Sequence, residues 1–125
     1  MITGIGVDAV QISRMEKWAD NNALLLRYFD LKELDIIRER GKSMVQSLAA
    51  HFAAKEAFGK ALGTGFAGIA LKDIMILNKR DQKPILYVEG SALEALKITG
   101  ANKTHVSLTH DGDMALAFVV LEVQE

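Results

Sequence analysis

The sequence predicts an α+β fold in which helices pack on a mainly antiparallel sheet. Three observations support this prediction. Residues 2–10 alternate as a short strand, residues 14–62 contain three stretches with helical spacing, and the pattern returns to alternation from residue 71. The expected element order is β-α-α-α-β-β-α-β-β. A chain of 125 residues has the usual length of one domain, so we expect residues 1–125 to form a single domain.

The composition narrows the class of function. Hydrophobic residues make up 50% of the chain and charged residues 25%, which is typical of a globular protein. The formal net charge of -1 argues against binding of nucleic acid through an overall positive charge, so any site for an anion must be local. The longest apolar runs are too short to span a membrane. The chain has no cysteine and no signal-peptide pattern at its start, so we expect a cytoplasmic protein without disulfides or thiol catalysis.

The first strand, residues 2–10, carries Gly4, Gly6 and Asp8 on one face. Glycines weaken a strand, so two of them on one face indicate that something approaches closely there. Asp8 projects from this face, and a carboxylate in such a gap is a candidate metal-site or phosphate-site residue. The alternative is an aspartate that only turns the chain.

Two helices are expected before the central one. Ser13 with Glu16 three residues later matches a capping box and predicts a helix over residues 14–28. Asp30 is a candidate cap for a second helix over residues 31–40, which Gly41 ends. Basic and apolar side chains near the start of the first helix suit an acidic partner, although a solvated helix face is the simpler explanation.

The central helix begins at residue 43 or 47 and runs to about residue 62, where a Gly-Thr-Gly sequence stops it. Its many alanines indicate that another backbone, a subunit or a ligand comes close. Glu56 and Lys60 are four residues apart and project from one face, either as an ordinary surface ion pair or as part of a metal-bridged anion site. His51 lies one turn before Lys55 and is either a packed side chain or part of an anion site.

The second half of the chain predicts two hairpins around a short helix. Residues 71–77 and 84–90 form the first hairpin, joined by a polar turn over residues 78–83. Ser91 is expected to cap a helix over residues 91–98 that ends at Gly100. Residues 104–110 and 114–122 form the second hairpin around an Asp-Gly bend. His110 lies at the mouth of this hairpin, as a phosphate contact, a proton-transfer group or an exposed turn histidine.

Four segments together resemble the holo-acyl-carrier-protein synthase family of 4′-phosphopantetheinyl transferases. They are GVDAVQISR, SLAAHFAAKEAFGKALGTG, KPILYV and HVSLTHDGDMALAFVVLE, and the resemblance extends over residues 2–122. It implies transfer of the phosphopantetheine arm of coenzyme A, the co-substrate, to a serine of apo acyl carrier protein in fatty acid biosynthesis. Adenosine 3′,5′-bisphosphate is the second product.

The resemblance also implies the catalytic residues, namely Asp8, Glu56 and Lys60. Asp8 and Glu56 match the family's Mg²⁺ ligands, which water and pyrophosphate oxygens complete, and Lys60 matches its phosphate-binding lysine. Two acids and a lysine suit a cation that keeps waters and substrate phosphates in its coordination shell. The proton of the acceptor serine goes either to Glu56 or to a metal-associated water.

The nucleotide contacts are implied in the same way. His110, and more weakly Ser107 and Thr109, match the contacts of the 3′-phosphate, while Lys83 and Pro84 match the turn near the adenine. The chain departs from the family pattern at two positions. His51 stands where arginine is common, and Gln82 stands where glycine is usual. The first change replaces a permanent cation with a titratable side chain.

Family members form trimers with the coenzyme A cleft between subunits, so the resemblance implies a homotrimer with sites at subunit interfaces. Arg14 matches the family position that meets acidic residues of the carrier protein. The expected partner-binding residues are Arg14, Met15, Lys17 and Arg27. Two rival functions remain open: a non-catalytic module that binds coenzyme A or a nucleotide, and a structural oligomerisation domain in which Glu56 and Lys60 form only an interface ion pair.

Overall fold

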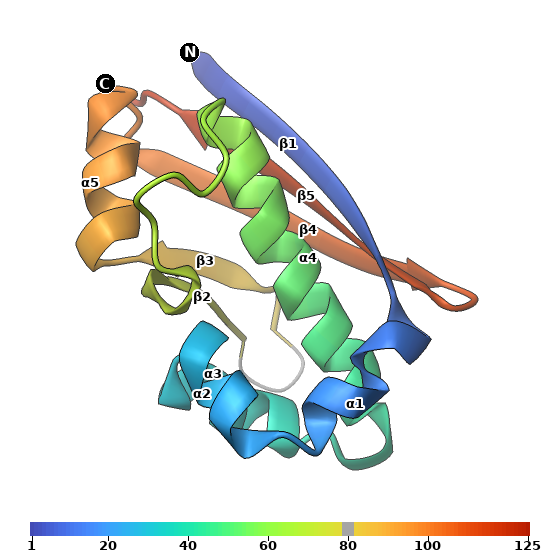
Figure 1. The fold of residues 1–125 in the computed structure, drawn as a ribbon. Coiled ribbons are helices and arrows are strands. Elements are labelled where there is room, and N and C mark those ends of the chain that lie inside the picture. The colour runs from blue at the N-terminus through green and yellow to red at the C-terminus, as the bar shows by residue number, and fades with distance from the viewer. Residues whose placement is uncertain (79–81) are drawn as a thin grey trace.

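The computed structural model describes residues 1–78 and 82–125 and has the predicted α+β fold (Figure 1). The strands are β1 (Ile2–Gln11), β2 (Ile74–Leu77), β3 (Ile85–Val88), β4 (Lys103–Asp111) and β5 (Met114–Glu122). The α-helices are α1 (Glu16–Ala19), α2 (Asn22–Tyr28), α3 (Leu31–Arg38), α4 (Met44–Leu62) and α5 (Gly90–Ile98). Short 3-10 helices are η1 (Ile12–Met15), η2 (Gly41–Ser43) and η3 (Leu71–Asp73). The predicted order is confirmed when α1 and α2 count as one element.

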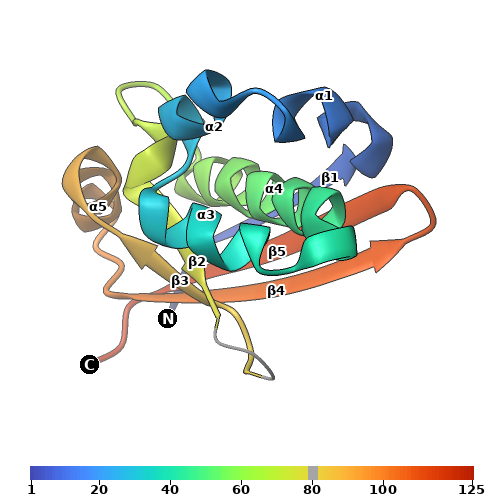
Figure 2. The ribbon, with the colours of Figure 1, turned by 90° about the horizontal axis from the view of Figure 1, so that it is seen from below.

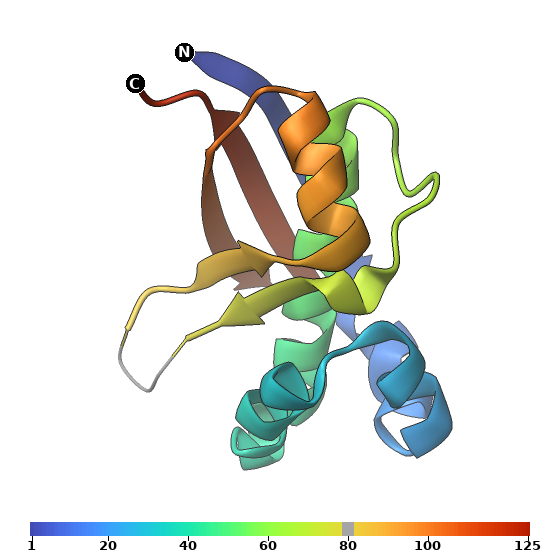
Figure 3. The same ribbon diagram turned by 90° about the vertical axis from the view of Figure 1, so that its left-hand side faces the viewer.

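The strands form two antiparallel sheets among the described residues. In the larger sheet β5 lies between β1 and β4, and β2 pairs with β3 in a separate hairpin that runs across it (Figure 3). Both predicted hairpins are confirmed, but the single sheet is corrected to two. The Thr104 hydroxyl of β4 donates to the Leu86 carbonyl at 3.1 Å and links the sheets without a backbone ladder. Figure 2 shows α4 between the larger sheet and the α1–α2 segment.

The glycine face of β1 packs directly against α4. A Cβ atom on Gly4 would lie 2.0 Å from the Ala61 carbonyl oxygen, and one on Gly6 would lie 1.9 Å from the Ala57 carbonyl oxygen. Ala57 and Ala61 are buried in the core in turn. The close approach predicted from the two glycines is therefore an approach of helix to strand. These alanines serve packing within the chain, so the idea that their face admits a ligand or subunit is corrected.

The helix predicted over residues 14–28 is broken. Ser13 does not cap it, because its hydroxyl donates to Asp113 Oδ2 at 2.6 Å and its backbone N–H to Asp113 Oδ1 at 3.0 Å. The Asn21 side chain instead caps α2 by accepting from the Leu24 N–H at 3.1 Å. Asparagine is a strong N-cap, and it restarts the helix where the capping-box pattern predicted continuity.

Other boundaries follow local chemistry. Asp30 caps α3 as predicted, accepting from the Lys32 N–H at 2.8 Å. Gly63 ends α4 with a φ of 83°, a left-handed conformation that favours glycine. Ser91 does not cap α5; its hydroxyl donates to Asp73 at 2.6 Å, and the helix begins at residue 90. Of the turn predicted over residues 78–83, positions 79–81 lie outside the described residues.

Within residues 1–78 and 82–125, the helices cover one face of the three-stranded sheet and leave the other uncovered (Figure 2). On its other face Ile5 is 59% exposed, Val7 52% and Phe118 45%. This uncovered apolar surface, the outer sheet face, is continuous because Val7 pairs with Phe118 across β1 and β5. No helix within residues 1–78 and 82–125 has the length and apolar character needed to cross a membrane.

Candidate active site

Asp8, Glu56 and Lys60 come together where β1 meets α4. Asp8 follows Gly6 on the strand face that packs against the helix, and its side chain is only 16% exposed. The Lys60 ammonium lies 2.9 Å from Asp8 Oδ1 and 3.2 Å from the Val7 carbonyl oxygen. The glycines thus allow the helix to come close enough for side chains from two distant segments to form one polar cluster, which we call the acidic cluster.

The charges of the acidic cluster influence one another. Burial and the Asp8 charge raise the pKa of Glu56, while Lys60 and Arg14 oppose that rise. The hydrogen bond to Asp8, together with its charge, raises the pKa of Lys60. Arg14 is exposed in η1 and lies close enough for its charge to act on Glu56. Two carboxylates and two cations therefore share this edge of the molecule.

The donor set of the acidic cluster fits a hard divalent cation. Asp8 and Glu56 offer carboxylate oxygens, the ligands that Mg²⁺ prefers, and the effect of Asp8 on the pKa of Glu56 reflects repulsion that a cation would relieve. Across residues 1–78 and 82–125, no group of three or more His, Cys, Asp or Glu side chains is placed to hold a metal ion. The carboxylate pair would leave coordination positions for water and phosphate oxygens.

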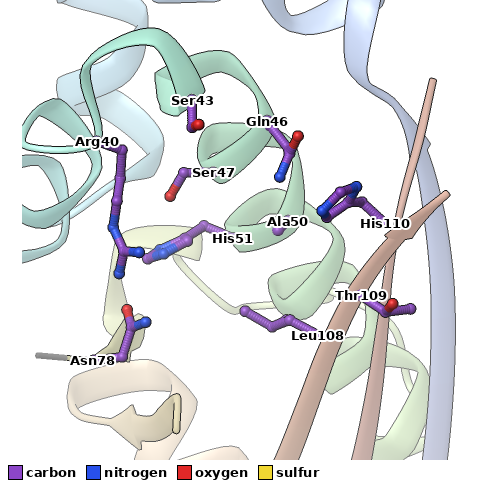
Figure 4. A pocket seen from close by; sticks show the side chains of 10 residues that line it. All are labelled: Arg40, Ser43, Gln46, Ser47, Ala50, His51, Asn78, Leu108, Thr109 and His110. Carbon is purple, nitrogen blue, oxygen red and sulfur yellow. The ribbon is translucent and has the colours of Figure 1, made fainter. Parts of the chain in front are cut away.

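A pocket of about 150 Å³ opens between the start of α4 and the end of β4 (Figure 4). Most of the residues that line it have polar side chains, including one guanidinium and two imidazoles: Arg40, Ser43, Gln46, Ser47, Ala50, His51, Asn78, Leu108, Thr109 and His110. Asn78 Oδ1 is buried and has no hydrogen-bond partner among the described residues. We call this the cationic pocket, because its nitrogen-bearing side chains suit an anionic ligand.

His51 reaches the cationic pocket from a buried network. Its Nδ1 lies 2.9 Å from Glu33 Oε2, and the Lys55 ammonium lies 2.7 Å from Glu33 Oε1. His51 is 2% exposed, while Glu33 and Lys55 are 0% exposed. Burial alone would raise the pKa of Glu33, but the Lys55 charge and the His51 hydrogen bond hold it below its ordinary value. Burial lowers the pKa of Lys55, against the opposing effect of Glu33.

No motif in the sequence predicts Glu33 and Lys55 as a pair, although helical spacing contains a signal. Glu33 is four residues before Ile37, which is 0% exposed, so both project from the inward face of α3. Lys55 follows Phe52 by three residues on the inward face of α4. A charge at an inward position predicts a buried partner. The pocket residues Arg40 and Asn78 were also missed, since no motif identifies them.

The structure distributes the remaining predicted site residues unevenly. His110 and Thr109 line the cationic pocket with His51, whereas Ser107 is exposed on β4 outside it. Lys83 and Pro84, exposed and half-buried at the start of β3, are outside its lining too.

One predicted partner contact is corrected. Met15 is 0% exposed and belongs to the hydrophobic core, so its side chain is not part of any partner surface. Arg14, Lys17 and Arg27 are exposed, as the prediction requires. They come from η1, α1 and α2 and not from one continuous helix, and Arg27 lies 5.9 Å from the centre of the Tyr28 ring.

A fold that places a carboxylate pair, a lysine and a cationic pocket around one helix is suited to a ligand rich in phosphate. A sequence model of the family described as ACPS, the 4′-phosphopantetheinyl transferase superfamily, matches residues 4–119. The chain belongs to this superfamily.

The chain is also similar to individual members of this superfamily, in sequence and in structure. The chain is 49% identical over 122 residues to a holo-[acyl-carrier-protein] synthase of Treponema denticola, covering 98% of this chain and 99% of the relative. It is similar to the crystal structure of the Neisseria meningitidis synthase, with a TM-score of 0.85, 34% identity and coverage of 98% and 99%. The Bacillus anthracis synthase, described in complex with CoA (3′,5′-ADP), matches with a TM-score of 0.80, 32% identity and coverage of 99% of both chains.

Proposed function

We propose that this protein transfers the 4′-phosphopantetheine group from coenzyme A to a serine of apo acyl carrier protein, for fatty acid biosynthesis. The observation that carries the proposal is the acidic cluster of Asp8, Glu56 and Lys60 in a member of the 4′-phosphopantetheinyl transferase superfamily. A non-catalytic coenzyme A-binding module needs phosphate contacts but no carboxylate pair, so the enzyme is favoured. The match over residues 4–119 also supports one transferase domain spanning residues 1–125.

The residues of the acidic cluster have distinct roles in this reaction. The serine oxygen bonds to the phosphorus that carries pantetheine, and the bond from that phosphorus to the nucleotide's 5′-phosphate oxygen breaks. Lys60 binds the phosphate oxygens and offsets the charge that develops on the departing adenosine 3′,5′-bisphosphate. Glu56 is one candidate to accept the serine proton, as a carboxylate of the acidic cluster. A metal-associated water is the alternative base.

Asp8 and Glu56 are the residues that would hold Mg²⁺, with water and pyrophosphate oxygens as the other ligands. When bound, the metal supplies positive charge that stabilises the charge developing on the phosphate oxygens. Lys60 pairs with Asp8 at 2.9 Å and so keeps that carboxylate at the site.

The cationic pocket is the proposed site for the nucleotide end of coenzyme A. Arg40, His51 and His110 bring a guanidinium and two imidazoles to one pocket, which suits the 3′-phosphate, and Thr109 adds a hydroxyl. The unpaired Asn78 oxygen offers an acceptor to the adenine amino group. Lys83 and Pro84, directly before β3, are the proposed residues of the turn near the adenine.

The proposed surface for the carrier protein is the exposed basic set of Arg14, Lys17 and Arg27. Arg14 is the central residue, since its charge also acts on Glu56 and so marks the side from which the acceptor serine reaches the acidic cluster. A local basic patch steers an acidic partner although the whole chain has a net charge of -1.

A homotrimer with sites at subunit interfaces is the proposed assembly. The outer sheet face supports it, because Ile5, Val7 and Phe118 expose apolar surface that a second copy of the chain would cover. Ser107 pairs with Phe118 and lies on this face, where a ligand of a neighbouring subunit would reach it. We propose the cytoplasm as its location, since a chain without cysteine needs no oxidising compartment to fold.

Mass spectrometry of apo acyl carrier protein tests the proposal directly. The carrier protein is incubated with coenzyme A, Mg²⁺ and this chain, and we expect its mass to rise by one phosphopantetheine group. Reactions without the chain, without Mg²⁺ or with a carrier protein whose acceptor serine is alanine serve as controls. Coenzyme A that raises the melting temperature without any mass gain would instead indicate the binding module. No thermal response and no mass gain would indicate the structural oligomerisation domain.

A further inference from the structure

Glu33 takes no part in the proposed chemistry, yet its buried carboxylate joins three segments of the fold. Oε1 accepts from the Lys55 ammonium at 2.7 Å. Oε2 lies 2.9 Å from His51 Nδ1 and accepts from the Ile76 N–H at 3.2 Å. A buried carboxylate with this many partners is costly to desolvate, and a well-packed apolar pair often replaces such groups without loss of stability. Stability alone therefore does not explain this network.

Lys55 and Ile76 fix the carboxylate in place for His51. The Lys55 ammonium also donates to the Leu71 carbonyl at 3.0 Å and to the Ile74 carbonyl, so it is held from several sides. The Ile76 N–H belongs to strand β2 and shares Oε2 with the imidazole. Neither group can move without losing hydrogen bonds in the core. Oε2 is consequently a rigid acceptor aimed at one ring nitrogen.

This contact decides which nitrogen of His51 faces the cationic pocket. Glu33 remains ionised because its pKa is lowered, and an ionised carboxylate only accepts hydrogen bonds. The proton of the neutral ring is therefore on Nδ1, and Nε2 is the nitrogen left for other partners. Among the described residues, Nε2 has no hydrogen-bond partner, and His51 lines the cationic pocket. Figure 4 shows the ring on the side of the pocket that also carries Arg40.

We propose that Glu33 is a positioning residue, which holds the His51 ring with Nε2 toward the 3′-phosphate of coenzyme A. The inference rests on the proposed function, since it assumes that this phosphate occupies the cationic pocket. When the anion binds, the ring bridges two negative groups, with Nδ1–H on Glu33 and Nε2–H on the phosphate. Glu33 thus gives a histidine the fixed orientation of a dedicated phosphate contact.

The test compares coenzyme A with dephospho-coenzyme A, which lacks only the 3′-phosphate. The ratio of their dissociation constants, measured by calorimetry without carrier protein, isolates the 3′-phosphate contribution. Loss of a hydrogen bond to a charged group typically weakens binding about tenfold or more. We expect His51→Ala to reduce the ratio by about tenfold. A merely structural change would weaken both ligands equally and leave the ratio unchanged.

Two double variants distinguish a positioning role of Glu33 from a role in folding alone. E33Q/K55M removes both buried charges but keeps an amide oxygen that can accept from His51 and Ile76, so we expect the ratio to stay within about threefold of the wild type. E33M/K55M removes the acceptor, and we expect it to reduce the ratio as His51→Ala does, with no further loss when the His51→Ala change is added. An unchanged ratio in E33M/K55M, or equal loss in both doubles, would overturn the proposal.

A measurement on the wild type keeps the inference testable if E33M/K55M does not fold. We expect ¹⁵N NMR of the free protein to show His51 protonated at Nδ1, and coenzyme A but not dephospho-coenzyme A to shift the Nε2 resonance. A free ring protonated only at Nε2 would contradict the proposal. Phosphopantetheine transfer by the wild type with an unchanged ratio in His51→Ala would leave the proposed function standing and overturn this inference alone.

Discussion

Helix α4 carries two lysine–carboxylate clusters that have similar groups and opposite surroundings. Lys55 and its partner Glu33 are 0% exposed, whereas Lys60 is 56% exposed beside an Asp8 side chain that is 16% exposed. Lys55 and Lys60 are five residues apart, which places them about 140° apart around the helix. One lysine therefore faces the core and the other the edge of the sheet.

The comparison shows that burial distinguishes a charged pair that is complete within the fold from a charged cluster that can bind a ligand. The ammonium of Lys55 is surrounded by Glu33, two carbonyl oxygens and the Phe29 ring, whose centre lies 4.9 Å away. That site is complete without a ligand. The Asp8–Glu56–Lys60 cluster keeps two carboxylates close together at a partly open edge. The repulsion left there is what a cation and a phosphate ligand would relieve.

The largest expected effect is on the rate of the reaction and concerns the acidic cluster. Asp8→Asn and Glu56→Gln should each lower the rate of phosphopantetheine transfer by about 10²- to 10³-fold or more, because each removes a charge that acts in the transition state. Mg²⁺ should raise the melting temperature of the wild type but not of either variant, a readout that is independent of activity. Circular dichroism controls for the fold. Full transfer activity in both variants would disprove the site assignment.

The next prediction contrasts the two lysines directly. Lys55→Met should lower the free energy of unfolding by about 3–5 kcal/mol, because it leaves the Glu33 charge buried without its partner. Lys60→Met, the matched control, should change it far less, since its ion pair is largely exposed. Urea denaturation measures both values. Similar losses in the two variants would show that burial is not what distinguishes the clusters.

Gly6→Ala tests whether the close packing of β1 on α4 depends on the glycine. The added methyl group would lie 1.9 Å from the Ala57 carbonyl oxygen, so the backbone must move apart, at a cost of about 1–3 kcal/mol. Thr3→Ala, on the exposed outer face of β1, is the control and should have little effect. Thermal unfolding provides the measurement. A variant as stable as the control would mean that the contact between β1 and α4 is not tight.

Arg14→Glu separates the partner surface from the coenzyme A site. We expect the KM for carrier protein to rise about tenfold, because one cation on the proposed docking surface becomes an anion. The KM for coenzyme A should change less than the KM for carrier protein, since the cationic pocket does not include Arg14. Steady-state kinetics with each substrate varied in turn gives both constants. An equal rise in the two would count against a role in partner recognition.

The smallest expected effect is the dependence of stability on pH at Glu56. Its folded pKa is raised above the ordinary value of 4.5, so the folded state binds this proton more tightly than the unfolded state. The stabilisation from this proton is therefore complete below about pH 4.5 and is lost as pH rises through the folded pKa. Glu56→Gln should match the wild type at acid pH and become relatively more stable toward pH 7. The opposite trend, measured without divalent cations, would refute the raised pKa.

Much of the fold was predictable, because local patterns determine it. The alternation of residues 2–10, the glycine that ends α4 and the Asp-Gly bend each appear in the structure where the sequence places them. The predictions that were wrong involve competition from a distant residue or a better cap. Ser13 lost its capping role because Asp113, a hundred positions away, accepts both of its donors. Asn21 then offered a stronger start for α2.

The sequence by itself determined which residue types were available for chemistry and which faces they shared. Gly4, Gly6 and Asp8 lie on one strand face, and Glu56 and Lys60 on one helix face, because secondary-structure periodicity is a local property. Only the tertiary structure decided that the alanines of α4 would fill the gap above the glycines. It also sealed Lys55 in the core while leaving Lys60 at an open edge, since burial depends on what packs on each side of a helix. That difference in burial, which no local pattern encodes, distinguishes a complete ion pair from a site prepared for a ligand.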